Sequence, residues 1–171
     1  MMAECERALR AQDRCSGDVP NAYLRGDQNQ SEQVLARPPP GFRDVDEDGV
    51  AILWLMNAPL YGQTDAGAIW NRTANEFMEG SQTSVEGGVG GLGMERCHYD
   101  PCLYGKELTD RPYPDNEHVS LTMYVDDLKY FNDPTPSARK ERDESLARLY
   151  KRFAVKFGEQ NAAEDYFLGT N

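Results

Sequence analysis

The chain has 171 residues and a formal net charge of -11, with 39% apolar and 27% charged residues. This composition predicts one globular domain and excludes a disordered chain. The surplus of acidic residues argues against a protein that binds nucleic acid unaided, because such proteins carry a basic field toward the phosphates. The longest apolar run, residues 50–56, is too short to cross a membrane, and the N-terminus lacks a secretion signal. We therefore expect an intracellular protein of the cytoplasm or nucleus, not secreted and without a membrane partner.

The first third of the chain predicts short elements joined by turns. Residues 18–24 should end a strand and enter a helical segment. Residues 38–41 are prolines followed by a glycine, which predict a stiff turn because proline fixes φ. The acidic residues 44–48 predict a solvated loop, and residues 50–55 predict a buried strand.

Two helices are predicted from their caps and apolar stripes. Thr64 or Asp65 can cap the first helix, which runs to about Met78. Thr135 caps the second helix, with Pro136 at its first position. The apolar stripe of the second helix consists of Leu146, Leu149, Tyr150 and Phe153. Residues 1–16 and 80–95, the latter rich in glycine, are expected to be poorly ordered.

Asp126 and Asp127 lie in the middle of the most strand-like stretch, residues 119–131. A charged pair is unfavourable inside a buried strand, so we expect a hairpin with both carboxylates at its tip. Adjacent carboxylates repel each other, and a divalent cation removes that cost, so the pair indicates magnesium binding. A third carboxylate is then needed to hold two ions about 3.5–4 Å apart. Two solvated aspartates in an ordinary hairpin remain the alternative that residues 124–127 alone leave open.

Six landmarks occur in order along residues 17–169 and cover nearly the whole chain. The first, residues 17–27, contains Asp18-Val19 followed by Ala22, Tyr23 and Leu24. The others are residues 39–42, residues 60–62 with Trp70 eight positions beyond the glycine, residues 100–104, residues 124–127 and residues 166–169. In this order the landmarks resemble the reverse transcriptase of copia-type long-terminal-repeat retrotransposons.

The resemblance implies a fold and an activity. The fold is α+β, with an antiparallel sheet and helices on one face: the palm of a right-hand polymerase, with fingers and thumb largely missing, as a single partial domain over residues 1–171. The activity is RNA-directed DNA polymerisation, a nucleotidyl transfer that uses two Mg²⁺ ions, with Mn²⁺ as an alternative. The implied partners are an RNA template, a DNA primer, deoxynucleoside triphosphates, and the integrase and RNase H domains of the same polyprotein.

The resemblance also assigns roles to residues at matching positions. Asp18, Asp126 and Asp127 correspond to the catalytic, metal-binding aspartates, and the backbone carbonyl of Val19 completes the metal shell. The nucleotide is expected near Tyr23, which packs under the sugar, and near Gln63 and Asp65. The primer and template are expected near Tyr124, Arg148, Lys151 and Arg152, although the last three also suit a solvated amphipathic helix.

Some residues depart from the family pattern, and these departures favour hypotheses other than an active polymerase. Asp65 and Ala68 stand where the family has glutamine and arginine, and a carboxylate repels a triphosphate. The isolated chain is therefore expected to be inactive, and a catalytically inactive transposon-derived fragment is the main alternative. An acidic interaction module for a basic partner is a third hypothesis. The calcium-loop pattern at residues 44–49 has Leu55 where glutamate is required, and Cys97, His98 and Cys102 lack a fourth zinc ligand.

Overall fold

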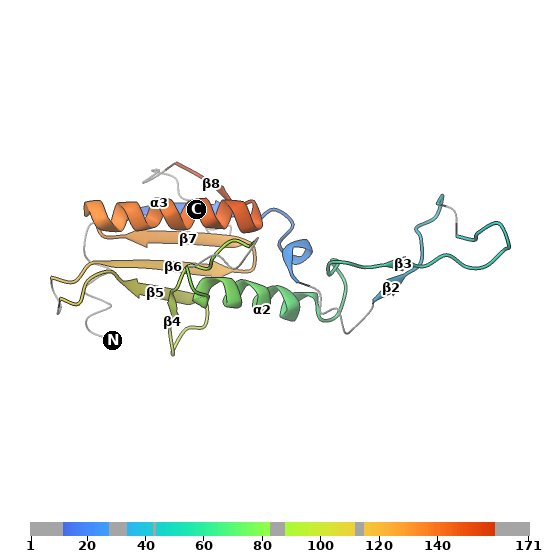
Figure 1. Ribbon diagram of the computed structural model, residues 1–171, viewed down its shortest axis with the longest axis horizontal. Helices are drawn as coiled ribbons and strands as arrows, with labels where there is room; N and C mark the ends of the chain where they lie inside the picture. The colour runs from blue at the N-terminus through green and yellow to red at the C-terminus, as the bar shows by residue number, and fades with distance from the viewer. Residues whose placement is uncertain (1–11, 28–33, 43, 83–87, 112–114, 160–171) are drawn as a thin grey trace. The chain divides into compact units, whose positions relative to one another are not determined.

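The computed structural model describes residues 12–27, 34–42, 44–82, 88–111 and 115–159. Its elements are β1 (Asp13–Asp18), the short 3-10 helix η1 (Ala22–Arg25), β2 (Leu35–Ala36), β3 (Trp54–Leu55), α2 (Ala66–Glu79), β4 (Glu95–Arg96), β5 (Leu103–Glu107), β6 (His118–Tyr124), β7 (Asp127–Asn132), α3 (Pro136–Phe153) and β8 (Lys156–Phe157) (Figure 1). These elements confirm the α+β class. The sequence predicts one domain, whereas backbone contacts divide the chain into unit 1, residues 1–22 and 74–171, and unit 2, residues 23–73.

Unit 1 is built on a six-stranded sheet in the order β4-β5-β6-β7-β1-β8. Every neighbouring pair in it is antiparallel. Residues along β6 and β7 alternate between buried and half-buried, as expected for strands with one face against a core. The buried face carries Val119, Leu121, Met123, Leu128 and Tyr130. The expected hairpin between residues 119 and 131 is confirmed.

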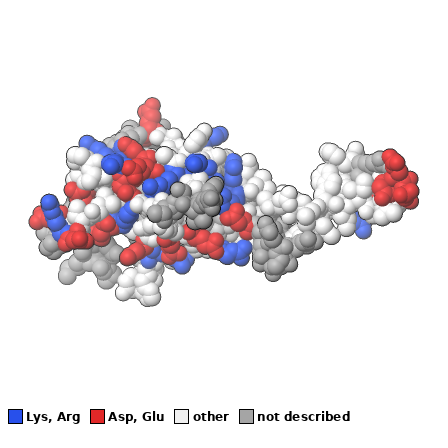
Figure 2. Space-filling model, viewed as in Figure 1, with Lys and Arg blue, Asp and Glu red and all other residues white. Residues whose placement is uncertain are grey.

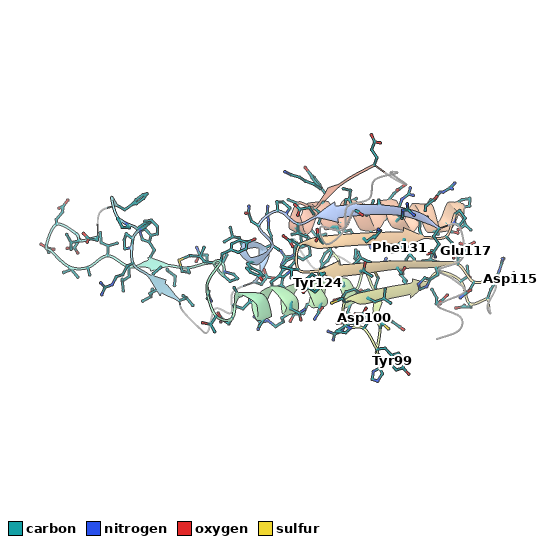
Figure 3. All side chains as sticks on the ribbon, turned by 180° about the vertical axis from the view of Figure 1, so that it is seen from behind. Tyr99, Asp100, Asp115, Glu117, Tyr124 and Phe131 are labelled. Carbon is teal, nitrogen blue, oxygen red and sulfur yellow. The ribbon has the colours of Figure 1, made fainter. Side chains whose placement is uncertain are left out.

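Helix α3 and the C-terminal half of α2 cover that buried face. The ring of Phe77 on α2 meets the ring of Phe153 on α3 with centroids 5.0 Å apart. The hydroxyl of Tyr130 on β7 donates to Ser145 Oγ on α3 at 3.3 Å. In Figure 1 α3 lies in front of the strands, and Figure 3 shows the sheet from behind, with α3 beyond it. Within the described residues, no helix packs on the other face of the sheet, which we call the open face.

The predicted boundaries of both helices are confirmed, but the predicted apolar stripe of α3 is partly wrong. Thr135 caps α3, its side chain accepting from the backbone N–H of Ala138, and Pro136 occupies the first turn. Leu149 and Phe153 are buried as expected, but Tyr150 is 67% exposed. Residues four apart share a helix face, so Tyr150 is rotated away from the stripe that Ser145, Leu149 and Phe153 form.

The predicted buried strand at residues 50–55 is wrong. Within that run only Trp54–Leu55 forms a strand, paired with β2 in a two-stranded sheet. Val50, Trp54 and Leu55 are 61%, 41% and 51% exposed. Burial needs a second layer against the strands, and β2 and β3 form a two-stranded ribbon, which buries little apolar surface by itself. An apolar run predicts a strand here but not a core.

The expectation of poor order at residues 1–16 and 80–95 stays a prediction, and some of these residues have described positions in the fold. Strand β1 begins at Asp13, and Leu92 and Met94 are almost fully buried. The glycines serve close packing, since a Cβ on Gly91 would lie 2.4 Å from the carbonyl oxygen of Gly80. Residues 1–11, residues 83–87 and the landmark at residues 166–169 lie outside the described residues. Among the described helices, none has the length and apolar character needed to span a membrane.

Candidate functional site

Strand pairing brings together carboxylates that are far apart in sequence. In the register of β1 and β7, Asp18 lies directly opposite Asp127. The backbone N–H of Val19 donates to the carbonyl oxygen of Asp126 at 2.8 Å, which extends the contact by one residue. Side chains directly opposite each other in an antiparallel pair point to the same face, with Cβ atoms about 4.5–5.5 Å apart. Asp18 and Asp127 are therefore neighbours on the open face, next to Asp126.

The turn between β6 and β7 has a strained backbone. Val125 and Asp126 link the two strands, with Tyr124 paired to Asp127. Val125 has a φ of 56°, in the left-handed region that a β-branched residue rarely adopts. Such a residue costs on the order of 1–3 kcal/mol, and strain of this kind concentrates at functional sites. The strain is located next to the two aspartates.

The carboxylates of Asp18, Asp126 and Asp127 have no partner among the residues that the structure describes. Asp18 and Asp126 are exposed and Asp127 is half-buried. No hydrogen bond or ion pair reaches these side chains in the part of the chain that the structure describes. That part also contains no group of three or more His, Cys, Asp or Glu side chains arranged to hold a metal ion. The backbone thus brings the carboxylates together while their side chains are not placed as ligands.

The donor chemistry of this end of the sheet nevertheless fits a hard divalent cation. Carboxylate oxygens and backbone carbonyls are the ligands that Mg²⁺ takes. Because no described residue bonds to the side chains of Asp18, Asp126 and Asp127, each can turn about its first side-chain torsion without breaking an interaction with that part of the chain. Val19 follows Asp18, and its N–H donates to the backbone carbonyl of Asp126. These are the residues that would hold such an ion.

Lys156 is a neighbour of the site that the sequence did not single out. In the register of β1 and β8 it lies opposite Asp18, so Lys156, Asp18, Asp127 and Tyr124 form one row across four strands. A Cβ on Gly17 would lie 2.7 Å from the Phe157 ring, so the glycine lets β8 approach β1 closely. The row could not be found from the sequence, because β8 has only two residues and its pairing depends on that packing.

Tyr124 lies at the carboxylate end of the sheet, as Figure 3 shows, and is 56% exposed. Its position opposite Asp127 agrees with the expected place beside the aspartates.

The basic residues of α3 lie on a different side of the sheet from the carboxylates. Asp127 alternates with Leu128 along β7, and α3 packs on the face that carries Leu128. Arg148 donates to the carbonyl of Gly91 at 3.3 Å, and the Arg152 guanidinium lies over the Phe153 ring. Figure 2 shows basic side chains on this side interspersed with acidic ones. Arg148, Lys151 and Arg152 are thus not brought to the carboxylates, and their contact with nucleic acid stays a prediction.

The residues expected at the nucleotide belong to unit 2. The ring of Tyr23 packs against Tyr61, with centroids 4.8 Å apart. The amide of Gln63 donates to the carboxylate of Asp65 at 2.7 Å, just before α2 begins. Their roles at a nucleotide stay a prediction.

Comparisons with other proteins do not assign a family. No protein-family model, curated protein sequence or solved structure matches the chain. The features of the chain that bear on function are the ordered landmarks of its sequence and the geometry where β1 ends and β7 begins.

Proposed function

We propose that this chain is the palm part of an RNA-directed DNA polymerase from a copia-type retrotransposon. The observation that carries the proposal is the pairing of Asp18 with Asp127, beside the turn that contains Asp126. Residues 18 and 127 belong to landmarks widely separated in sequence, and the proposed chemistry requires them to meet. The strained backbone at Val125 supports the proposal, because it holds the aspartates at a sharp turn.

The proposed reaction is attack of a primer 3′-hydroxyl on the α-phosphate of a deoxynucleoside triphosphate, with release of pyrophosphate. Two bound Mg²⁺ or Mn²⁺ ions would supply a lowered pKa at the hydroxyl and charge neutralisation at the triphosphate. Asp18 and Asp127 provide facing carboxylates from two strands, and Asp126 provides the third. The backbone carbonyl of Val19, the residue after Asp18, would complete the metal shell. Tyr23, five residues after Asp18, is the residue proposed to exclude a 2′-hydroxyl.

The remaining roles follow the same proposal. Tyr124, next to the carboxylates, contacts the primer end. Gln63 and Asp65 lie at the nucleotide, and Arg148, Lys151 and Arg152 run along the RNA template and DNA primer. The integrase and RNase H domains of the polyprotein complete the assembly.

A catalytically inactive, transposon-derived fragment is the second candidate. Asp65 favours it, because this carboxylate stands at the expected nucleotide position and is held by the amide of Gln63. A negative charge there opposes triphosphate binding unless a cation intervenes. The two candidates differ in turnover and agree on ancestry.

Primer extension separates the two candidates. The longer reading frame that contains residues 1–171 is expressed, and extension of a DNA primer on an RNA template is followed with Mg²⁺ and with Mn²⁺. We expect extension that falls by about a hundredfold or more in Asp126→Asn, because one carboxylate of the metal site is lost. Asp48→Asn, which removes an exposed carboxylate from the unit 2 loop, is the matched control and should leave the rate unchanged.

Equal extension by wild type and Asp126→Asn would show that the carboxylates are not catalytic and would end the proposal. Absence of extension by the folded wild-type protein with either cation would favour the inactive fragment. Restored extension in Asp65→Gln would identify Asp65 as the reason for that inactivity.

A further inference from the structure

Unit 1 contains a cavity of about 850 Å³ on the open face of its sheet. This volume is within the range of sites that bind small molecules or single nucleotides. Arg14, Ser120 and Phe131 line it, and each alternates along its strand with residues buried under the helices. Gly93 and residues 95–99, which include β4, form one wall. The cavity is therefore on the side of the sheet that carries Asp18 and Asp127.

Phe131 is an aromatic lining residue with one cation in the lining, Arg14, and another outside it, Lys129, close by. In the sheet register it lies opposite Arg14 on β1 and opposite Ser120 on β6. The ammonium of Lys129, two residues along the same face of β7, lies 5.9 Å from the centroid of the Phe131 ring. An aromatic ring with a guanidinium and an ammonium beside it can stack a base while the cations meet its phosphates.

His118 and Gly105 shape the other side of the cavity. A Cβ on Gly105 would lie 2.9 Å from the His118 ring, so the glycine leaves room for the imidazole to lie against β5. The carboxylate of Glu107 lies 3.5 Å from His118 Nδ1 and accepts from the Asn116 amide at 2.6 Å. This acidic lining residue is thus engaged by neighbours, which lessens its repulsion of an anion.

The centre of the open face differs in charge from the end of the same face that carries Asp18 and Asp127. The whole protein has a formal net charge of -11. The paired positions at the centre of the open face on β1, β7 and β6 contain two cations and no carboxylate; they are Arg14, Ser16, Lys129, Phe131, Ser120 and Thr122. Glu95 and Glu107 are at the β4–β5 side of the cavity. A basic, aromatic centre in an acidic protein is complementary to a polyanion with planar groups.

We propose that this cavity binds an unpaired segment of nucleic acid, with a base stacked on Phe131 and its phosphates beside Arg14 and Lys129. Phe131 is four residues along β7 from Asp127, about 13 Å at the usual rise of a strand. The site is therefore separate from the carboxylates, and binding there needs no metal ion. It does not depend on the proposed polymerase activity.

Fluorescence anisotropy of a labelled, unstructured RNA of about twelve nucleotides tests the site, since known single-strand sites have about this span. The full chain is titrated in EDTA, and the same sequence is tested as single-stranded DNA and as duplex. We expect saturable binding of both single strands and weaker binding of the duplex. Phe131→Leu should weaken binding about tenfold, whereas Phe131→Tyr keeps it, because stacking needs a ring. Arg14→Ala should lower the salt slope by about 0.7, the value for one phosphate contact.

A matched pair of substitutions on α3 is the control. Tyr150→Ala and Lys140→Ala remove an exposed aromatic residue and an exposed cation from outside the cavity, and should leave binding unchanged. Thermal unfolding verifies that each variant is folded, and if Phe131→Leu is not, then Arg14→Ala and Phe131→Tyr decide the test.

Three results would overturn the site. The first is an absence of saturable binding. The second is binding equal to that of the wild type in a folded Phe131→Leu or Arg14→Ala variant. The third is displacement of the labelled RNA by polyglutamate as effectively as by unlabelled RNA. Asp126→Asn distinguishes this proposal from the polymerase proposal. It should keep oligonucleotide binding in EDTA while it loses primer extension.

Discussion

Each unit has a tight turn that contains a residue with a positive φ, and this residue is a glycine in unit 2 and a valine in unit 1. In unit 2 the turn after Asp46 places Gly49 at a φ of 80°, and the Asp46 carboxylate accepts from the backbone N–H groups of Asp48 and Val50. In unit 1 the turn between β6 and β7 places Val125 at a φ of 56°. Glycine bears no steric cost in this region, whereas valine does. The strained choice occurs beside Asp126 and Asp127, which is where function can outweigh stability.

The strands that flank these turns also differ. Leu121 and Leu128 in unit 1 are fully buried under the helices, whereas Leu35 and Leu55 in unit 2 are more than half exposed. A packed hairpin can hold a strained turn, because the buried side chains on both strands fix its register. The exposed ribbon of unit 2 has fewer buried side chains to hold a strained turn, so a glycine, which adopts a positive φ without strain, is expected there.

Truncation of one leucine in each unit should give the largest contrast. Leu121→Ala leaves a cavity in the core and is expected to lower the free energy of unfolding by about 2–5 kcal/mol. Leu55→Ala removes an exposed side chain and should change it by less than about 0.5 kcal/mol. Urea denaturation followed by circular dichroism measures both. Similar losses in the two variants would show that the ribbon is as well packed as the sheet.

Valine in place of glycine at the unit 2 turn should have the next largest effect. Gly49→Val imposes on this turn the steric cost of a left-handed residue, about 1–2 kcal/mol. Amide hydrogen exchange around the bridge between Val45 and Ala51 reports the local loss of protection. Gly67→Ala is the control, because this helical glycine has open space around its Cβ position, and it should stabilise slightly. Unchanged exchange in Gly49→Val would mean that the turn does not require glycine.

Relief of strain at the hairpin should stabilise unit 1. Val125→Asn introduces a residue that tolerates left-handed φ, and the free energy of unfolding should rise by about 1 kcal/mol. Val50→Asn, at an exposed position of unit 2 without a positive φ, should give no gain. A decrease in stability for Val125→Asn, measured by urea denaturation, would contradict a strained turn.

Alkaline pH should weaken unit 1 through its buried tyrosines. Burial raises the pKa of Tyr104 to about 12, and burial also raises the pKa of Tyr130. Because the pKa of Tyr104 is higher in the folded state, its protonated hydroxyl contributes to the free energy of unfolding. This contribution is fully present below pH 10, the pKa of the unfolded state, and is lost as the pH rises toward 12. Tyr104→Phe should reduce this alkaline loss and cost about 1 kcal/mol or less at neutral pH, since the hydroxyl donates to Asn75.

Tyr99→Phe, at a side chain that is 90% exposed, is the control for the pH profile and should reproduce the wild-type curve. Thermal unfolding between pH 8 and pH 11 measures all three proteins. A Tyr104→Phe profile identical to that of the wild type would rule out Tyr104 as a source of the alkaline loss.

Local signals in the sequence predict several helices and strands, whereas strand pairing, burial and the cavity depend on long-range packing. A charged pair inside an apolar stretch predicted the hairpin at Asp126, and a threonine followed by proline predicted the start of α3. The meeting of Asp18 with Asp126 and Asp127 has no local signal and is expected only from the resemblance, and the pairing of β1 with β7 is not predicted at all. Burial of residues 50–55 was predicted wrongly, because a sequence does not show whether a second layer covers a strand. The cavity on the open face could not be predicted, since Arg14, His118 and Phe131 come from three strands.

The proposed polymerase requires that Asp18, Asp126 and Asp127 together bind a divalent cation. Titration of the nitrogen-15-labelled chain with Mn²⁺, followed by paramagnetic broadening of amide signals, tests it most directly. We expect selective broadening at residues 17–19 and 125–128 in the wild type, and loss of this broadening when Asp18→Asn and Asp127→Asn are combined. Broadening confined to the acidic loop at residues 44–48, or unchanged in the double variant, would contradict it.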